Sequence, residues 1–190
     1  MRLDACRIWF QRRKDGKDSM QILRWILWIP RWLWCLIYCW LFWKLPTYEP
    51  AKWNDNNGIQ FNNNCYNYAC DIQTGTFAQP GRATGHEYAD LVCGDVLNGA
   101  LSDGLVNLLS NQPCPYCSHQ VALVVASPEI DFHWYRLDDN GFWSHKPGPT
   151  PVRNVDNSNN PISDPRTADR GPYTDFCGFL CVCKCKVTIN

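Results

Sequence analysis

The chain has 190 residues, which suits one domain with an appendage, and its formal net charge is zero. The charge is unevenly spread, because residues 1–31 carry eight Lys and Arg against three Asp, whereas residues 32–190 carry ten against fifteen acidic residues. An acidic globular part excludes nucleic acid as the expected partner. The twelve cysteines favour an oxidising compartment outside the cytosol.

The chain begins with a basic tail, residues 1–21, which precedes an apolar, Trp-rich segment at 22–45. The apolar segment is long enough to cross a bilayer as a helix, although Pro30 and Arg31 interrupt it. The basic tail predicts a single-pass topology, with a cytoplasmic N-terminus and an extracellular or periplasmic globular domain. A cleaved signal peptide and a helix lying on the membrane surface stay open as alternatives. All three make the lipid bilayer a partner of this segment.

A polar linker, residues 46–63, leads into a cysteine-rich globular domain, residues 64–190. Asn63 or Asn64 can cap a helix that begins at Cys65. Later apolar runs, with a turn at DDNG, predict antiparallel strands, and helix followed by strands indicates an α+β fold. The expected elements are helix within 89–109, strands at 119–127, 131–138, 141–146 and 176–189, and a long polar loop at 147–172.

One thiol and several polar side chains follow the order that thiol catalysis requires. Cys65 opens a helix, where backbone N–H groups stabilise a thiolate. His119 begins a buried strand, and Asp131 and His133 lie two apart, on one face of the next strand. Either of the last two could hold the His119 tautomer. The sequence therefore predicts Cys65 as nucleophile and His119 as base.

This order resembles the papain-like thiol hydrolases of the NlpC/P60 and CHAP type. NNCYNYA is similar to the start of their catalytic helix, and HQVALVV is similar to the strand that carries their histidine. The resemblance implies a papain-like fold and cleavage of peptide or peptidoglycan-like amide bonds, with no metal ion or cofactor. It assigns Cys65 as nucleophile, His119 as base, and His133 or Asp131 as the orienting residue. The Gly that usually precedes the histidine is replaced by Ser118.

A closer likeness covers more of the chain. NNCYNYAC, TFAQPGRATG, DFHWYRLDDNGFWSHKPG and DPRTADRGPYTDFCGF resemble a family of small secreted proteins, some of which are labelled insoluble shell-matrix proteins. This resemblance implies a shared fold and secretion more than an activity. It also implies that the segments around WSHKPG and DPRTADRGPYTDFCG belong to the fold and are not linkers.

Aromatic and basic side chains cluster along the same strands. Aromatic faces stack on sugars or peptide side chains, and they equally build cores. We expect substrate binding by Tyr66, Trp134, Trp143, His145 and Lys146. His145 is also an alternative third member of the catalytic set.

Nine cysteines follow the apolar segment, enough for four disulfides and one free thiol. If Cys65 instead pairs with Cys70 or Cys93, the chain is a non-catalytic extracellular matrix or binding protein that keeps the same fold. A redox alternative rests on the CPYC motif at Cys114 and Cys117. A zinc alternative draws on the CxxC and CxC pairs formed by Cys114, Cys117, Cys181, Cys183 and Cys185.

Overall fold

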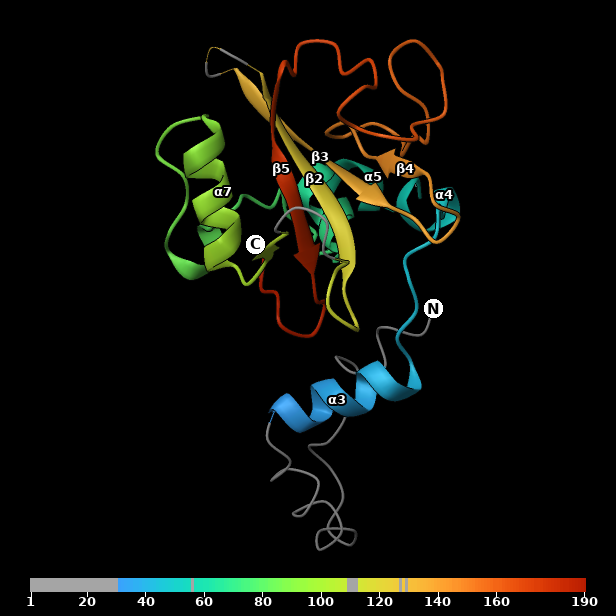
Figure 1. Cartoon of the computed structure of the whole chain (residues 1–190), viewed down its shortest axis with the longest axis vertical. Helices are drawn as coiled ribbons and strands as arrows, with labels where there is room; N and C mark the ends of the chain where they lie inside the picture. The colour runs from blue at the N-terminus through green and yellow to red at the C-terminus, as the bar shows by residue number, and fades with distance from the viewer. Residues whose placement is uncertain (1–30, 56, 109–112, 127, 129) are drawn as a thin grey trace, which may run out of the picture.

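The computed structural model describes residues 31–190, apart from 56, 109–112, 127 and 129. Five antiparallel strands form one sheet in the order β1-β5-β2-β3-β4, with helices packed against it (Figure 1). The helices are α3 (Arg31–Leu41), α4 (Pro50–Trp53), α5 (Ile59–Asn62), α6 (Cys65–Cys70) and α7 (Cys93–Ser102), with a short 3₁₀ turn at Arg82–Thr84. The strands are β1 (Val106–Asn107), β2 (His119–Ala126), β3 (Asp131–Leu137), β4 (Trp143–His145) and β5 (Asp175–Val182).

The central strand β2 is buried on both faces, which explains its continuous apolar run. Val121 and Leu123 enter a core beneath α6 and α7. Ala122 and Val124 enter a second core on the opposite face of the sheet. β2 therefore separates two apolar layers, and its neighbours β3 and β5 share both.

The expected hairpins are present. β2 pairs with β3 from Ala126 opposite Asp131 to Val121 opposite Arg136. β3 then pairs with β4 through a tight turn that the hydrogen bond from the Asp138 amide to the Phe142 carbonyl closes at 2.9 Å. The structure thus confirms the DDNG turn.

Helix α6 is short and capped at both ends. The Asn64 side chain accepts hydrogen bonds from the amides of Tyr66 and Asn67, and the Asn67 side chain accepts one from the Asn64 amide. This reciprocal capping box satisfies N–H groups that the first turn leaves unpaired. At the other end Asp71 adopts a left-handed conformation, with φ of 53°. The caps fix where Cys65 stands.

The Asp71 carboxylate interacts with three cationic side chains from distant parts of the chain. Lys184 bonds one oxygen at 2.7 Å and Lys52 bonds the other, while Arg136 lies 3.6 Å away. Burial alone would raise the pKa of this carboxyl, but the three cations together lower it to about 2. The cluster joins the end of α6 to α4, β3 and the C-terminal turn.

The loop between β4 and β5 is held in place along its length. Backbone bridges join Trp143 to Ile162 and His145 to Arg153. The Asp156 carboxylate accepts hydrogen bonds from three loop amides, and these bonds lower its pKa. The loop lies above β4 (Figure 1) and contributes Ile162, Ala168 and Tyr173 to the second core. It is therefore part of the fold, and not a mobile connection.

Helix α3 corrects the predicted single-pass topology. It has 11 residues, and no helix within the described part of the chain has the length and hydropathy that a bilayer crossing requires. Cys35 and Cys39 of α3 are instead bonded to Cys185 and Cys117 of the globular domain. The segment that the sequence predicts to be a membrane anchor is thus linked covalently to the globular domain through Cys35 and Cys39. The basic tail and residues 22–30 lie outside the described residues.

Candidate functional site

Cys65 is a free, buried thiol at the first position of α6. Burial raises the pKa of the Cys65 thiol to about 12. Hydrogen bonds to the sulfur from the backbone of Trp134, Tyr66 and Cys65 itself act in the opposite direction, because they favour the thiolate. Desolvation outweighs these hydrogen bonds because the sulfur is almost fully shielded from water. At neutral pH the resting group is therefore a protonated thiol.

Cys65 and His133 line one cavity of about 350 Å³ beside the start of β3. Tyr173 stacks on the His133 ring, with centroids 5.2 Å apart, and donates a hydrogen bond to Asp131 at 2.8 Å. The walls combine aromatic and apolar side chains with a few polar groups. They are formed by Asn64, Phe77, Gln79, Tyr88, Leu91, Asp131, Phe132, Pro147, Gly148 and Tyr173.

His133 and His145 form a buried pair, with His133 Nε2 2.8 Å from His145 Nδ1. Nε2 of His145 lies 3.1 Å from the Val155 carbonyl oxygen, which can only accept, so this nitrogen carries a hydrogen. Burial lowers the pKa of His145 to about 4, and burial together with His145 holds the pKa of His133 well below its ordinary value. Both rings are therefore neutral at pH 7. It follows that His133 donates through Nε2 and keeps Nδ1 unprotonated, as a general base requires.

His119 occupies the far end of the same sheet. Its Nε2 bonds the Ala69 carbonyl oxygen at 2.7 Å, near the end of α6 opposite Cys65. Burial lowers the pKa of His119 to about 4. The antiparallel register explains the separation, because the first residue of β2 lies beside the last residues of β3, whereas His133 lies near the first. The predicted Cys65–His119 pair is corrected: the residues lining the Cys65 cavity include His133 and exclude His119.

Most of the expected substrate-binding side chains belong to the cores. Tyr66 and Trp134 pack together with centroids 5.2 Å apart, and both are fully buried. Trp143 stacks on Phe179 in the second core. The Lys146 ammonium is buried and donates to three backbone carbonyls. The cavity wall is built instead by residues such as Tyr173, which follows a Pro- and Asp-rich stretch without a periodic pattern.

The disulfides also correct the redox and zinc alternatives. Cys114 is bonded to Cys181 and Cys117 to Cys39, so the two cysteines of CPYC do not face each other. The fourth bridge joins Cys93 to Cys177. Together with the Cys35–Cys185 bridge, these bonds occupy four of the five cysteines in the zinc alternative and leave Cys183 as a free thiol.

Comparison with known proteins gives one relative and no fold match. No family model matches the sequence, so nothing there supports the NlpC/P60 or CHAP likeness, and no solved structure matches either. The chain is 55% identical over 133 residues to insoluble matrix shell protein 1 of Ruditapes philippinarum. The match covers 70% of this chain and 87% of that relative. The chain therefore belongs to the family of insoluble matrix shell protein 1.

Proposed function

We propose that this chain is a disulfide-stabilised extracellular protein that takes part in an insoluble secreted matrix. The observation that carries the proposal is its 55% identity over most of a relative named as an insoluble matrix shell protein. Four disulfides support it, because such bonds persist in oxidising compartments and are rare in the cytosol.

The outer face of α3 supplies a surface for association. It exposes large apolar side chains, of which Leu36 and Trp40 lie one turn apart on the same side of the helix, and Trp40 is 79% exposed. Apolar groups gathered on one exposed face favour contact with other apolar surfaces. Trp34 and Leu41, which lie two turns apart on another side of α3, are exposed as well. A rigid domain that displays such a face is suited to incorporation into a solid matrix.

Expression of the full chain in secretory eukaryotic cells tests this function. We expect the protein in sedimentable extracellular material, with the four disulfides of residues 31–190 intact on non-reducing peptide mapping. A Leu36→Ser, Trp40→Ser variant should shift toward the soluble medium, while the matched loop variant Phe142→Ser should not. Retention of the wild type inside the cell, or a wholly soluble secreted form, would contradict the proposal.

A second candidate function, thiol hydrolysis, is favoured by one observation: the free Cys65 thiol and the His133 imidazole line the same cavity. In this mechanism Cys65 attacks an amide or ester carbonyl while His133 Nδ1 takes the thiol proton. His145 orients the His133 ring and shares the charge that develops on it. The proton then passes to the leaving group, and water hydrolyses the acyl-enzyme.

The mechanism must account for the raised pKa of Cys65. Because the resting thiol is neutral, the thiolate must form only as the carbonyl is attacked. The papain-like fold that the sequence predicted belongs to this candidate and stays a prediction with it.

Hydrolysis of peptide amides and thioesters by the purified full chain separates the two functions. We expect Cys65→Ala to abolish any turnover and Cys70→Ala to preserve it, since Cys70 is an equally buried free thiol of the same helix outside the cavity lining. Equal rates in the two variants, or no turnover by the wild type, would remove the hydrolase candidate and leave the matrix function standing.

A further inference from the structure

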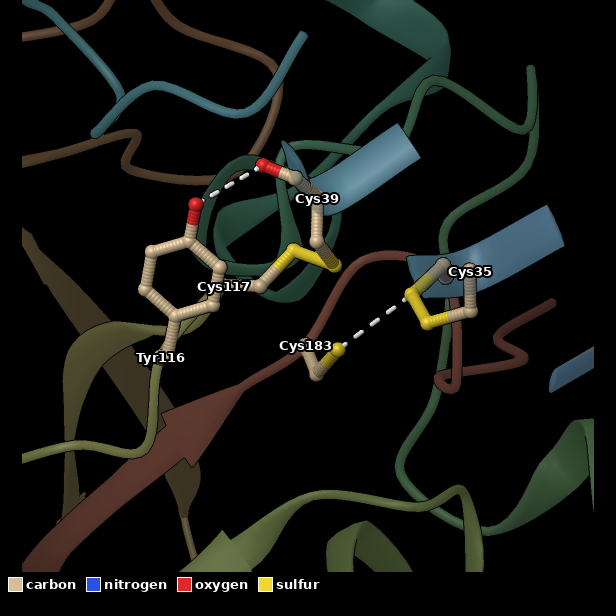
Figure 2. Close-up of a disulfide and its surroundings, with 6 residues drawn as sticks. Cys35, Cys39, Tyr116, Cys117 and Cys183 are labelled. Carbon is tan, nitrogen blue, oxygen red and sulfur yellow. Dashed lines mark hydrogen bonds between the residues drawn. A yellow bond between two sulfur atoms is a disulfide. The ribbon is translucent and has the colours of Figure 1, made fainter. Parts of the chain in front are cut away.

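Five cysteine sulfurs gather where α3 meets the globular domain. Cys35 and Cys39 come from α3, one turn apart and therefore on one face of that helix. Cys117 precedes β2, and Cys183 and Cys185 follow β5 (Figure 2). Four of these sulfurs form the two disulfides that tie α3 to the domain, and Cys183 alone keeps a thiol.

The free thiol stands in contact with one of these disulfides. Cys183 Sγ lies 3.4 Å from Cys185 Sγ, and the sulfurs of Cys35, Cys183 and Cys185 all lie within 4.8 Å of one another. A turn closed by the hydrogen bond from the Lys186 amide to the Cys183 carbonyl, 2.8 Å long, brings Cys183 and Cys185 together. The backbone thus supports a Cys183–Cys185 contact without any movement of α3.

We propose that Cys183 is the nucleophile of an internal thiol–disulfide exchange site that opens the Cys35–Cys185 bridge. The Cys183 thiol loses its proton to solvent, and its sulfur attacks Cys185 Sγ after a side-chain rotation that places the three sulfurs in line. A Cys183–Cys185 bond forms as the Cys35–Cys185 bond breaks, and the electron pair leaves on Cys35 sulfur, which takes up a proton. One disulfide replaces another, so no oxidant or reductant is consumed.

The exchange moves the free thiol from the C-terminal turn to α3. The helix then keeps one covalent link, the Cys39–Cys117 bridge, and gains a thiol at Cys35. That thiol can attack a disulfide of a second copy by the same chemistry and join two chains. Neither Cys65 nor Cys70 can replace Cys183, because both lie in the core between α6 and the sheet.

Disulfide mapping of the purified full chain tests the proposal. The protein is held at pH 6 and at pH 8.5, quenched with acid, alkylated with N-ethylmaleimide in denaturant at mildly acidic pH and digested with trypsin. Trypsin leaves residues 32–44, 83–136, 171–184 and 185–186 joined through disulfides in both forms, so tandem mass spectrometry is used to locate the alkylated cysteine within this joined species. We expect two species, one alkylated at Cys183, and one alkylated at Cys35 with Cys183 joined to Cys185. The second should form faster at pH 8.5 than at pH 6, because the thiolate is the attacking group.

Two variants make the result decisive. Cys183→Ala should leave Cys35 unlabelled at both pH values, while Cys70→Ala, which removes another buried free thiol, should behave as the wild type. Alkylation of Cys183 without any alkylation of Cys35 in the wild type would overturn the proposal. So would labelling of Cys35 that persists in Cys183→Ala, since another nucleophile would then open the bridge.

Discussion

Replacement of Asp71 by Asn tests the charge cluster that joins α6 to the C-terminal turn. The pKa of Asp71 is lowered from 3.8 to about 2 by Lys184, Lys52 and Arg136, against the effect of burial. A difference of this size corresponds to roughly 2 kcal/mol of folding free energy at neutral pH. Because the folded-state pKa is the lower one, this stabilisation is present above about pH 4 and is lost as the pH falls toward 2. Asp71→Asn should lack it at every pH.

Urea unfolding with the disulfides intact, followed by tryptophan fluorescence between pH 2 and pH 7, measures the effect. We expect the variant to be roughly 2 kcal/mol less stable than the wild type at pH 7 and nearly equal to it at pH 2. The matched control is Asp139→Asn, at an exposed carboxylate of the β3–β4 turn, which should change stability little. A difference between wild type and Asp71→Asn that does not shrink on acidification would refute the reasoning.

Three further predictions concern the cores and cysteines. With its pKa near 12, Cys65 should react with iodoacetamide at pH 8 about a thousandfold more slowly in the native protein than after unfolding, as peptide mapping can show; rapid native labelling would contradict its desolvation. Leu180→Ala, at a fully buried position of β5, should cost about 2–5 kcal/mol in urea unfolding, and a loss below 1 kcal/mol would mean that this core is loosely packed. Removal of the Cys93–Cys177 bridge by a double Ala variant should lower the free energy of unfolding by about 3 kcal/mol. The Cys114–Cys181 bridge remains in this variant, so the Cys93–Cys177 bond closes an effective loop of about 25 residues, and an unchanged Tm would refute the prediction.

The sequence predicts local structure well where one signal dominates. The apolar run of β2, the DDNG turn and the Asn64 cap each depend on residues close together in the chain, and the structure confirms all three. The long loop after β4 could be expected to belong to the fold only through the resemblance to secreted proteins. Its polar composition alone does not reveal the bridges that hold it.

The site was harder to predict because it depends on which ends of the strands meet. The hydrophobic periodicity of a strand shows which face of the sheet a side chain occupies. It does not show how neighbouring strands run, and so it does not reveal that the first residue of β2 lies far from the first residue of β3. For that reason the sequence predicts His119 as the partner of Cys65, whereas in the structure His133 shares the Cys65 cavity. The pairing of Cys39 with Cys117, 78 residues apart, is equally invisible to spacing rules.

The two disulfides of α3 have a consequence for proteolysis. The connection between α3 and α4 carries an exposed lysine, Lys44, where trypsin can cut. A cut there would leave the two fragments joined through Cys39–Cys117 and Cys35–Cys185, so the nicked protein would migrate as one species until a reductant is added. Even after exchange at Cys183 one bridge would remain. A protease acting on this connection would therefore change the backbone continuity of the protein without releasing its apolar helix.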